Sequence, residues 1–315
     1  MIAPRRLATV PLATALSLCL LIVSPLLLAG SALVAVATRS SRPARTVGLL
    51  MAYAFIELRT LVRFAVGDVD GERLVREFLA AAYGAARKLL DVEVVLDPSS
   101  ASPESLPRDQ PVIVLSRHCG PGDTVLVAWL LMFRYRLQVH IVLKAVLRYE
   151  PVLDFAGQRG WLCFLARGDR ARQQIHSLAA SLAGGQALLL FPEGANFTWP
   201  RWHSAIAELR NTGRILAAAR ALRRSYTLPP RTGGAIAAVC GAPSANVLVL
   251  THNGFCPDGR ARPWWQLPIH RQLLVRTTLI SAAQLPEPDQ LSPWMERTWT
   301  KVDAWVAGHT DDQTA

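Results

Sequence analysis

A histidine and an aspartate in this chain have the residue types and spacing of a general base and its orienting partner. His118 and Asp123 follow residues 112–115, an apolar run that is typical of a buried strand, and open α/β sheets place their chemistry at strand ends. The Gly-Pro-Gly segment between the two residues favours a tight turn that folds Asp123 back under the ring of His118. Such a pair could remove the proton from a substrate hydroxyl without a Ser or Cys nucleophile.

The same two residues also allow structural interpretations. Asp123 precedes the apolar residues 124–131 and could be the N-cap of a helix. His118 could be a hydrogen-bonded histidine of the core. A histidine and an aspartate at this spacing are common by chance, so the choice depends on the rest of the chain.

A second strand-end motif favours the catalytic interpretation. The segment Phe191-Pro192-Glu193-Gly194 follows the apolar residues 187–190, and Glu193 lies 75 positions after His118. With residues 160–167 and 228–234, these two motifs resemble, in order, the four sequence blocks of the glycerolipid acyltransferase family, which contains the 1-acylglycerol-3-phosphate acyltransferases. The resemblance covers about residues 90–255.

The resemblance implies a role for each matching residue. His118 would be the base and Asp123 its partner, while Arg167, Glu193 and Gly194 would hold the glycerol phosphate of the acceptor. Arginine presents a planar fork that suits phosphate oxygens. A carboxylate repels phosphate, so Glu193 should face the polyol or organise a hydrogen-bond donor. Gly194 lets the backbone come close to the ligand.

The implied reaction transfers a fatty acyl group from an acyl-CoA or acyl carrier protein thioester to the free hydroxyl of a lysophospholipid. The most specific acceptor would be 1-acyl-sn-glycerol 3-phosphate, which would give phosphatidic acid in phospholipid biosynthesis. Backbone amides of the 120–124 turn are expected to stabilise the oxyanion. Another lipid acceptor, a lipid-binding membrane protein without turnover and a membrane-anchored hydrolase remain alternatives.

The chain departs from the family pattern at two places. Ala195 and Asn196 follow the second motif, where many relatives carry a threonine and a cation. Arg117 stands directly before the base, where asparagine is common in relatives. Arg117 is therefore a candidate for the replacement charge at the substrate, and a solvated arginine at a strand end is the alternative.

The N-terminus has the composition of a membrane segment. The 315-residue chain is 51% hydrophobic with a mean hydropathy of +0.24, and residues 7–38 carry no charge. Pro25 lies near the middle of this uncharged run. Arginines flank the run on both sides: Arg5, Arg6, Arg39, Arg42 and Arg45. By the positive-inside rule, both ends of the run are expected in the cytoplasm. A bent re-entrant hairpin fits best; a single tilted span and a cleaved signal peptide, with Ala35-Val36-Ala37 as the cleavage site, are alternatives.

The charge pattern favours phosphate-bearing partners. The net charge is +11 and the pI is about 10.2, but no nucleic-acid-binding motif is present, so membrane lipids, the lysophospholipid and acyl-CoA are the expected partners. Residues 46–64 predict an amphipathic helix that lies on the membrane or in the core. A predicted helix over 203–224 carries arginines that meet the membrane surface, the phosphates of coenzyme A, or solvent: Arg210, Arg214, Arg220, Arg223 and Arg224.

The cysteines indicate neither a zinc site nor a redox pair. Five cysteines are scattered without a Cys-x-x-Cys spacing, so we expect no metal site. We also expect no cofactor beyond the thioester co-substrate. The scattered cysteines fit a reducing compartment, and we expect the protein at the cytoplasmic face of the cell membrane.

The alternation of strand-like and helix-like segments predicts one α/β domain with a mixed, largely parallel sheet flanked by helices. Strands are expected near 92–96, 112–116, 139–144, 161–166, 187–191, 235–240, 246–251 and 272–279. The expected organisation is a membrane-associated helical segment over 1–66, an acyltransferase domain over 67–310 and a disordered tail over 311–315.

Overall fold

The computed structural model describes residues 4–67, 70–120, 122–158, 160–166, 168–254 and 269–310. Contacts divide the chain into two units. The first contains the chain up to Glu93, the segment His140–Leu165 and a short stretch that ends at Arg271. The second contains Val94–Val139, the chain from Ala166 onward to Arg262, and Gln272–Ala315.

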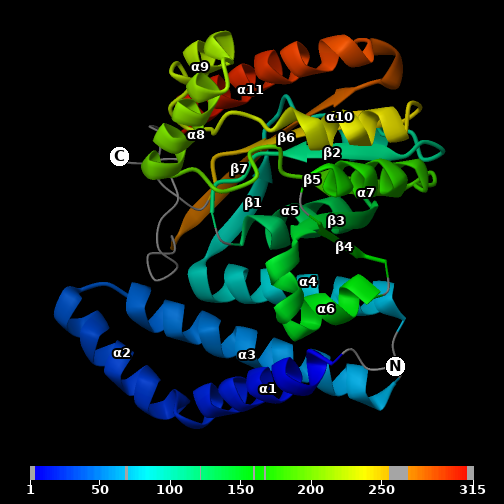
Figure 1. Cartoon of the computed structure of the whole chain (residues 1–315). Helices are drawn as coiled ribbons and strands as arrows, with labels where there is room; N and C mark the ends of the chain where they lie inside the picture. Colours follow the sequence, from blue (N-terminus) through cyan, green and yellow to red (C-terminus); the bar gives the residue numbers. More distant parts are fainter. Residues whose placement is uncertain are drawn as a thin grey trace. The chain divides into compact units, whose positions relative to one another are not determined.

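Seven strands form one mixed, mostly parallel sheet in the order β1-β7-β6-β2-β5-β3-β4 (Figure 1). The strands are β1 (Val92–Leu96), β2 (Val112–Ser116), β3 (Gln138–Lys144), β4 (Leu162–Leu165), β5 (Gln186–Leu190), β6 (Asn246–His252) and β7 (Arg271–Ile280). β2 runs parallel to both β5 and β6, whereas β7 is antiparallel to β6. The prediction of an α/β domain with a mixed, largely parallel sheet is confirmed.

The centre of the sheet explains why its strands read as unbroken apolar runs. Every residue of β2 and of β6 is buried, as expected for parallel strands that are covered on both faces. Val112 of β2 is in register with Ala187 of β5 and with Asn246 of β6. The carboxyl ends of these three parallel strands therefore lie at one edge of the sheet.

The helices of the second unit are α5 (Asp123–Phe133), α7 (Asp169–Ala180), α8 (Trp199–Asn211), α9 (Ile215–Ala221), α10 (Thr232–Gly241) and α11 (Leu291–Gly308). Helix α10 packs closely on α7, and the two are drawn side by side in Figure 1. A Cβ atom at Gly241 would lie 2.4 Å from the carbonyl oxygen of His176, so only glycine permits this approach.

Two sequence-based expectations in this unit are wrong. The strand expected at 235–240 is instead part of α10, whose small alanine and glycine residues allow α7 to pack closely against it. The single helix expected at 203–224 is instead two helices. The break falls at Gly213, whose φ of +73° ends the first of them.

The helices of the first unit are α1 (Arg6–Ile22), α2 (Ser24–Thr38), α3 (Arg42–Val66), α4 (Gly71–Leu90) and α6 (Pro151–Gln158). Within the described residues no single helix has the length and apolar composition to cross a membrane. Helices α1 and α2 meet that standard only when taken together, and they are bent by 57° at the break between them. Both pack on α3, and α3 packs on α4, so the predicted boundary at residue 66 falls between two helices in contact.

The first arginines of the chain are held by an acidic residue. Arg5 and Arg6 both donate to the carboxylate of Asp154 in α6, with nitrogen–oxygen distances of 2.5 and 2.6 Å. Arg6 also lies over the ring of Phe155, 4.2 Å from its centroid. Further along α1, Ser17 donates to the buried carboxylate of Glu57 in α3. These contacts hold the start of the uncharged run inside the first unit.

Candidate active site

The turn between β2 and α5 brings His118 and Asp123 together. The His118 Nδ1 and Asp123 Oδ2 atoms are 3.3 Å apart, and the backbone N–H groups of Cys119 and Gly120 donate to the same oxygen at 2.5 and 2.6 Å. Gly122, with a φ of +90°, is the N-cap residue of α5. Asp123 therefore binds the turn that precedes it rather than acting as the N-cap.

The electrostatics of the pair suit a base and its partner. The His118 side chain is 26% exposed and that of Asp123 only 1%. Burial pushes the pKa of Asp123 upward, but electrostatic interaction with His252, the hydrogen bond from His118 and the Gly120 amide together hold the pKa below its ordinary value. An ionised carboxylate accepts a hydrogen bond from Nδ1–H, which leaves the lone pair on Nε2 of His118 available to take a proton from a hydroxyl.

Two backbone N–H groups of this turn already donate hydrogen bonds within the turn. The Gly120 N–H donates to Asp123, and the Asp123 N–H points to the carbonyl oxygen of Gly120 at 3.4 Å. The expectation that the 120–124 amides stabilise an oxyanion is therefore wrong for these two, because their protons are directed into the turn.

Glu193 ties the second motif to the first. Its Oε1 accepts from the His118 backbone N–H at 3.0 Å, and its Oε2 accepts from the Leu228 N–H at 2.8 Å. The residue is only 2% exposed, and burial raises the pKa of its carboxyl group to about 7 against the opposing effects of Arg117 and the two amides. Of the two predicted orientations, the structure has the one that organises donors, which here are backbone amides.

Phe191 and Gly194 complete the turn after β5. The ring of Phe191 packs against the imidazole of His118, with 4.8 Å between their centroids. Gly194 has a φ of +67°, and a Cβ atom built there would lie 3.1 Å from Cδ of Arg231. The backbone N–H of Arg231 donates to the Pro192 carbonyl at 2.7 Å, so this exposed arginine lies beside the second motif.

Comparison with known proteins agrees with this geometry. A protein-family model named Acyltransferase matches residues 99–248. This part of the chain is therefore an acyltransferase domain. The crystal structure of PlsC, the 1-acyl-sn-glycerophosphate acyltransferase from Thermotoga maritima, has a similar fold, with a TM-score of 0.56 and 18% identity over 86% of this chain and 98% of that one. None of the curated proteins matches the chain.

In this acyltransferase, Arg117 is fully enclosed, so the interpretation as a solvated arginine is wrong. It is 0% exposed, and its guanidinium donates to the carbonyl oxygens of His252 at 2.7 Å and Tyr226 at 2.9 Å. Burial acts to lower its pKa, but the surrounding acidic groups, Cys119 and Glu193 first, raise it overall. Through these hydrogen bonds Arg117 joins the end of β2 to the end of β6 and to the segment at Tyr226. Its predicted role as a replacement charge at the substrate stays a prediction.

The sequence analysis did not identify His252, which lies at the end of β6. Its Nε2–H donates to the Arg117 carbonyl at 2.9 Å, while Arg117 donates back to the His252 carbonyl. Burial lowers the pKa of His252, so the ring is held in its neutral form. The position of this histidine at the end of an apolar strand could have suggested it, as it did for His118.

Arg167, the predicted phosphate ligand, lies outside the described residues, so its contact with the acceptor stays a prediction. Among the residues that the structure does describe, no group of three or more His, Cys, Asp or Glu side chains could hold a metal ion.

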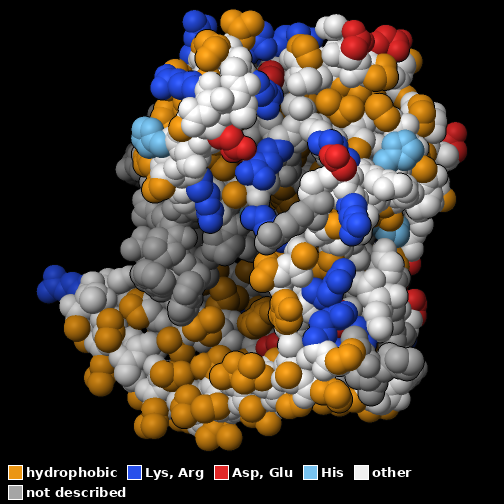
Figure 2. Space-filling view, in the orientation of Figure 1, with side chains coloured by type: hydrophobic (Ala, Val, Ile, Leu, Met, Phe, Trp, Pro, Cys, Tyr) orange, Lys and Arg blue, Asp and Glu red, His pale blue; other side chains and the backbone are white. Residues whose placement is uncertain are grey.

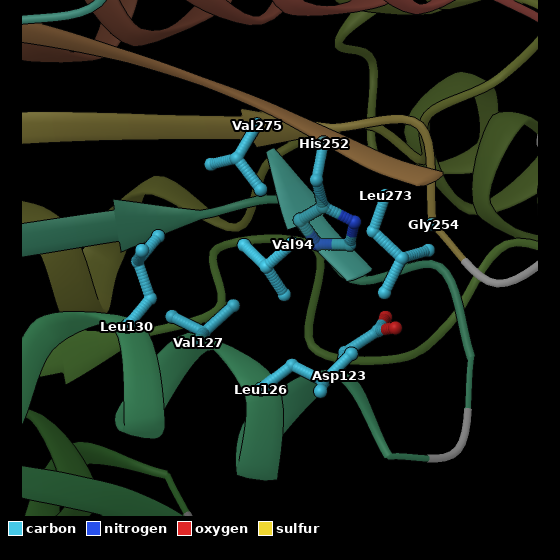
Figure 3. Close-up of a pocket in the computed structure, with 9 residues that line it drawn as sticks. All are labelled: Val94, Asp123, Leu126, Val127, Leu130, His252, Gly254, Leu273 and Val275. Atoms are coloured by element: carbon cyan, nitrogen blue, oxygen red, sulfur yellow. The ribbon is translucent and has the colours of Figure 1, made fainter. Parts of the chain in front are cut away.

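A small apolar pocket with a cavity volume of about 20 Å³ lies beside Asp123. Its walls are Leu126, Val127 and Leu130 of α5, Leu273 and Val275 of β7, and Val94 of β1. In Figure 3, the side chains of Asp123 and His252 point into it from α5 and from the end of β6. The pocket therefore joins an aliphatic lining to the carboxylate that orients the base.

Proposed function

We propose that this acyltransferase moves a fatty acyl group from acyl-CoA, or from acyl carrier protein, to the free hydroxyl of a lysophospholipid. The most specific acceptor is 1-acyl-sn-glycerol 3-phosphate, and the product is phosphatidic acid. The observation that carries the proposal is the pairing of the partly exposed His118 ring with the enclosed, ionised carboxylate of Asp123.

The chemistry follows from that pairing. Nε2 of His118 takes the hydroxyl proton while the hydroxyl oxygen attacks the thioester carbonyl, and Asp123 stabilises the imidazolium that forms. The new C–O bond closes as the C–S bond breaks. The leaving thiolate then takes the proton from the imidazolium, which returns His118 to its neutral form.

The pocket beside Asp123 supports an aliphatic substrate. Its lining is apolar apart from Asp123, His252 and the backbone at Gly254, so a methylene chain would gain about 0.8 kcal/mol for each CH₂ group buried there. The pocket is small, so α5 and β7 would have to move apart for the first carbons of the acyl chain to enter between them, with the carbonyl left near His118.

The N-terminal helices support a place at the cytoplasmic face of the cell membrane. Large aliphatic side chains of α1 and α2 stay exposed, among them Leu12 at 61%, Leu26 at 77% and Leu33 at 73%. A bilayer would cover such side chains, and the 57° bend suits a re-entrant hairpin. Protein that stays with membranes through a high-salt wash is the expected result, and release by salt alone would contradict this placement.

The function is tested with purified full-length protein, labelled acyl-CoA and a panel of lysophospholipid acceptors, with products read by mass spectrometry. We expect a labelled diacyl phospholipid. The exposed His176→Ala variant on α7 serves as the matched control for His118→Ala and should keep its activity. Labelled free fatty acid as the main product, with no acylated acceptor, would identify a hydrolase and contradict the proposal.

A further inference from the structure

Helices α8 and α9, residues 199–225 with their connections, form an arch that carries an unusual surface. Three aliphatic side chains are exposed there: Ile215 at 60%, Leu216 at 75% and Leu222 at 46%. Four exposed arginines lie among them, Arg210, Arg214, Arg220 and Arg223. Figure 2 shows Lys and Arg side chains mixed with hydrophobic ones where Figure 1 draws α8 and α9.

The opposite side of the arch has its own core. Phe197, Trp202, Ile206, Leu209, Ala218, Ala221 and Leu228 pack together there as buried side chains. The exposed aliphatic residues are therefore not the arch's own packing residues. Leu216 and Arg220, four positions apart, are neighbours on the helix face that points away from this core.

Both ends of the arch are bonded to the active site. The backbone N–H of Phe197 donates to the His118 carbonyl at 3.3 Å, and that of Leu228 donates to Glu193 at 2.8 Å. The return of the chain is fixed by α11, where Asp303 accepts from the N–H groups of Ser225 and Tyr226. A buried ion pair between Arg224 and Glu296, 3.0 Å long, adds to this anchor.

The arch is strongly basic. Glu208 on α8 is its single acidic residue, and residues 209–257 contain neither Asp nor Glu. Exposed aliphatic side chains surrounded by arginines are suited to the interface of an anionic bilayer, where the apolar groups enter the acyl boundary and the cations meet lipid phosphates. Coenzyme A phosphates would use the arginines but would leave Ile215 and Leu216 in water.

We propose that the α8–α9 arch is a second membrane-binding surface, distinct from α1 and α2, which docks on anionic lipid beside the catalytic histidine. This inference rests on the proposed function in one respect, since it assigns the arch the task of placing the site at the source of the lysophospholipid. The enzyme then receives its acceptor from the bilayer on which the arch lies.

Docking is measured directly with an environment-sensitive dye on an arch cysteine. Ala219→Cys is exposed and leaves every arginine and aliphatic residue of the arch in place, and Gln173→Cys on the exposed face of α7 is the matched control; both are made with the accessible native cysteines replaced by Ser. Full-length protein is reconstituted in phosphatidylcholine vesicles with increasing phosphatidylglycerol. The dye at position 219 should shift to the blue as phosphatidylglycerol rises, and the dye at position 173 should not.

The charge is tested by replacing three arginines, Arg214→Gln, Arg220→Gln and Arg223→Gln, against a control with the same loss of charge, Arg170→Gln, Arg297→Gln and Lys301→Gln. Each arginine should account for about a fivefold change in affinity for the anionic surface, so the arch triple should weaken docking by about 100-fold. High salt should have a similar effect on the unmodified chain.

Activity separates this inference from the proposed function. The arch triple should raise KM for acceptor presented in vesicles, while KM for a soluble short-chain acceptor and for acyl-CoA stays the same. No dye response at position 219, an equal response at position 173, or a rise in KM for acyl-CoA would overturn the docking surface. Loss of transfer by the unmodified chain with every acceptor would instead overturn the proposed function.

Discussion

Two neighbouring parallel strands end in turns that each bury one carboxylate, yet the two carboxylates have opposite properties. Asp123, after β2, and Glu193, after β5, are 1% and 2% exposed, and each accepts two backbone N–H groups. The pKa of Asp123 is held below its ordinary value, whereas burial raises that of Glu193 to about 7. The difference lies in the partners: Asp123 also bonds the ring of His118 and interacts with His252, whereas Glu193 bonds only backbone amides and the charge of Arg117 does not offset its burial.

The comparison teaches that burial alone does not decide what a carboxylate does. Asp123 is kept ionised and holds the base by its Nδ1–H, so its charge is part of the chemistry. Glu193 joins the backbone of the β2 turn to that of Leu228 and contributes geometry. Isosteric amide substitutions remove the charge from either residue with little change in shape, and they should therefore separate the two roles.

The largest effect is expected for the β2 turn. Asp123→Asn should lower kcat by about 10⁴-fold through a misoriented ring, and His118→Ala by about 10²–10⁴-fold through loss of the base. Steady-state kinetics with acyl-CoA and lysophosphatidic acid measure both, and circular dichroism verifies the fold. Near-normal turnover by a folded His118→Ala protein would contradict the mechanism.

For Glu193 the expected effect is on stability and its pH dependence. Folding raises the pKa of this group, so its contribution to stability is complete below the ordinary value of 4.5 and is lost as pH rises through about 7. A shift of this size is equivalent to about 3 kcal/mol at most. Glu193→Gln should remove this fall, as measured by urea denaturation from pH 4 to 8.

The exposed Glu208→Gln variant on α8 is the control for that measurement, because its carboxylate lies in solvent. Stability curves of wild type and Glu193→Gln that run parallel across the whole range would show that Glu193 is ionised in the folded protein. The two turns would then be electrostatically alike, and the comparison would fail.

The apolar pocket adjoins Asp123, so it provides a test confined to the β2 turn. Leu130 is buried in the pocket wall, and Leu130→Phe adds volume there, at a cost of about 1–3 kcal/mol when a long chain must also fit. Long-chain acyl-CoA should lose roughly 10-fold in kcat/KM relative to a short-chain donor. An equal loss for both donors would place the acyl chain elsewhere.

Much of this site could be predicted from the sequence because its residues follow apolar strands. His118, Asp123 and the Glu193 motif were located by that rule, and the parallel register of β2 with β5 brings them together. The strand expected at 235–240 failed because Ala and Cys in a short apolar run do not distinguish a strand from a small-residue helix that packs on a neighbour.

Contacts made by backbone groups were beyond sequence reasoning. Glu193 was expected to face the polyol or to organise a donor, and only the structure shows that the donors are the amides of His118 and Leu228. Arg117 was expected either at the substrate or in solvent, because no pattern reveals that its guanidinium meets the carbonyls of His252 and Tyr226. Such bonds depend on the path of the chain, which is a property of the whole fold.

The smallest effect is expected at the glycine of the β5 turn. Gly194 has a left-handed φ of +67°, and the nearest atom to a Cβ built there is Cδ of Arg231 at 3.1 Å, a flexible side chain that can move. Gly194→Ala should therefore cost only the backbone strain, about 1–2 kcal/mol of stability.

Gly254 has a similar φ of +73°, but its Cβ would lie 2.6 Å from Sγ and 2.7 Å from Cβ of the buried Cys119 in the β2 turn. Gly254→Ala should be the more destabilising of the two and should also lower kcat, since it displaces the residue next to His118. Thermal unfolding and kinetics on both variants measure the difference, and equal losses would show that the β2 turn yields as readily as the β5 turn.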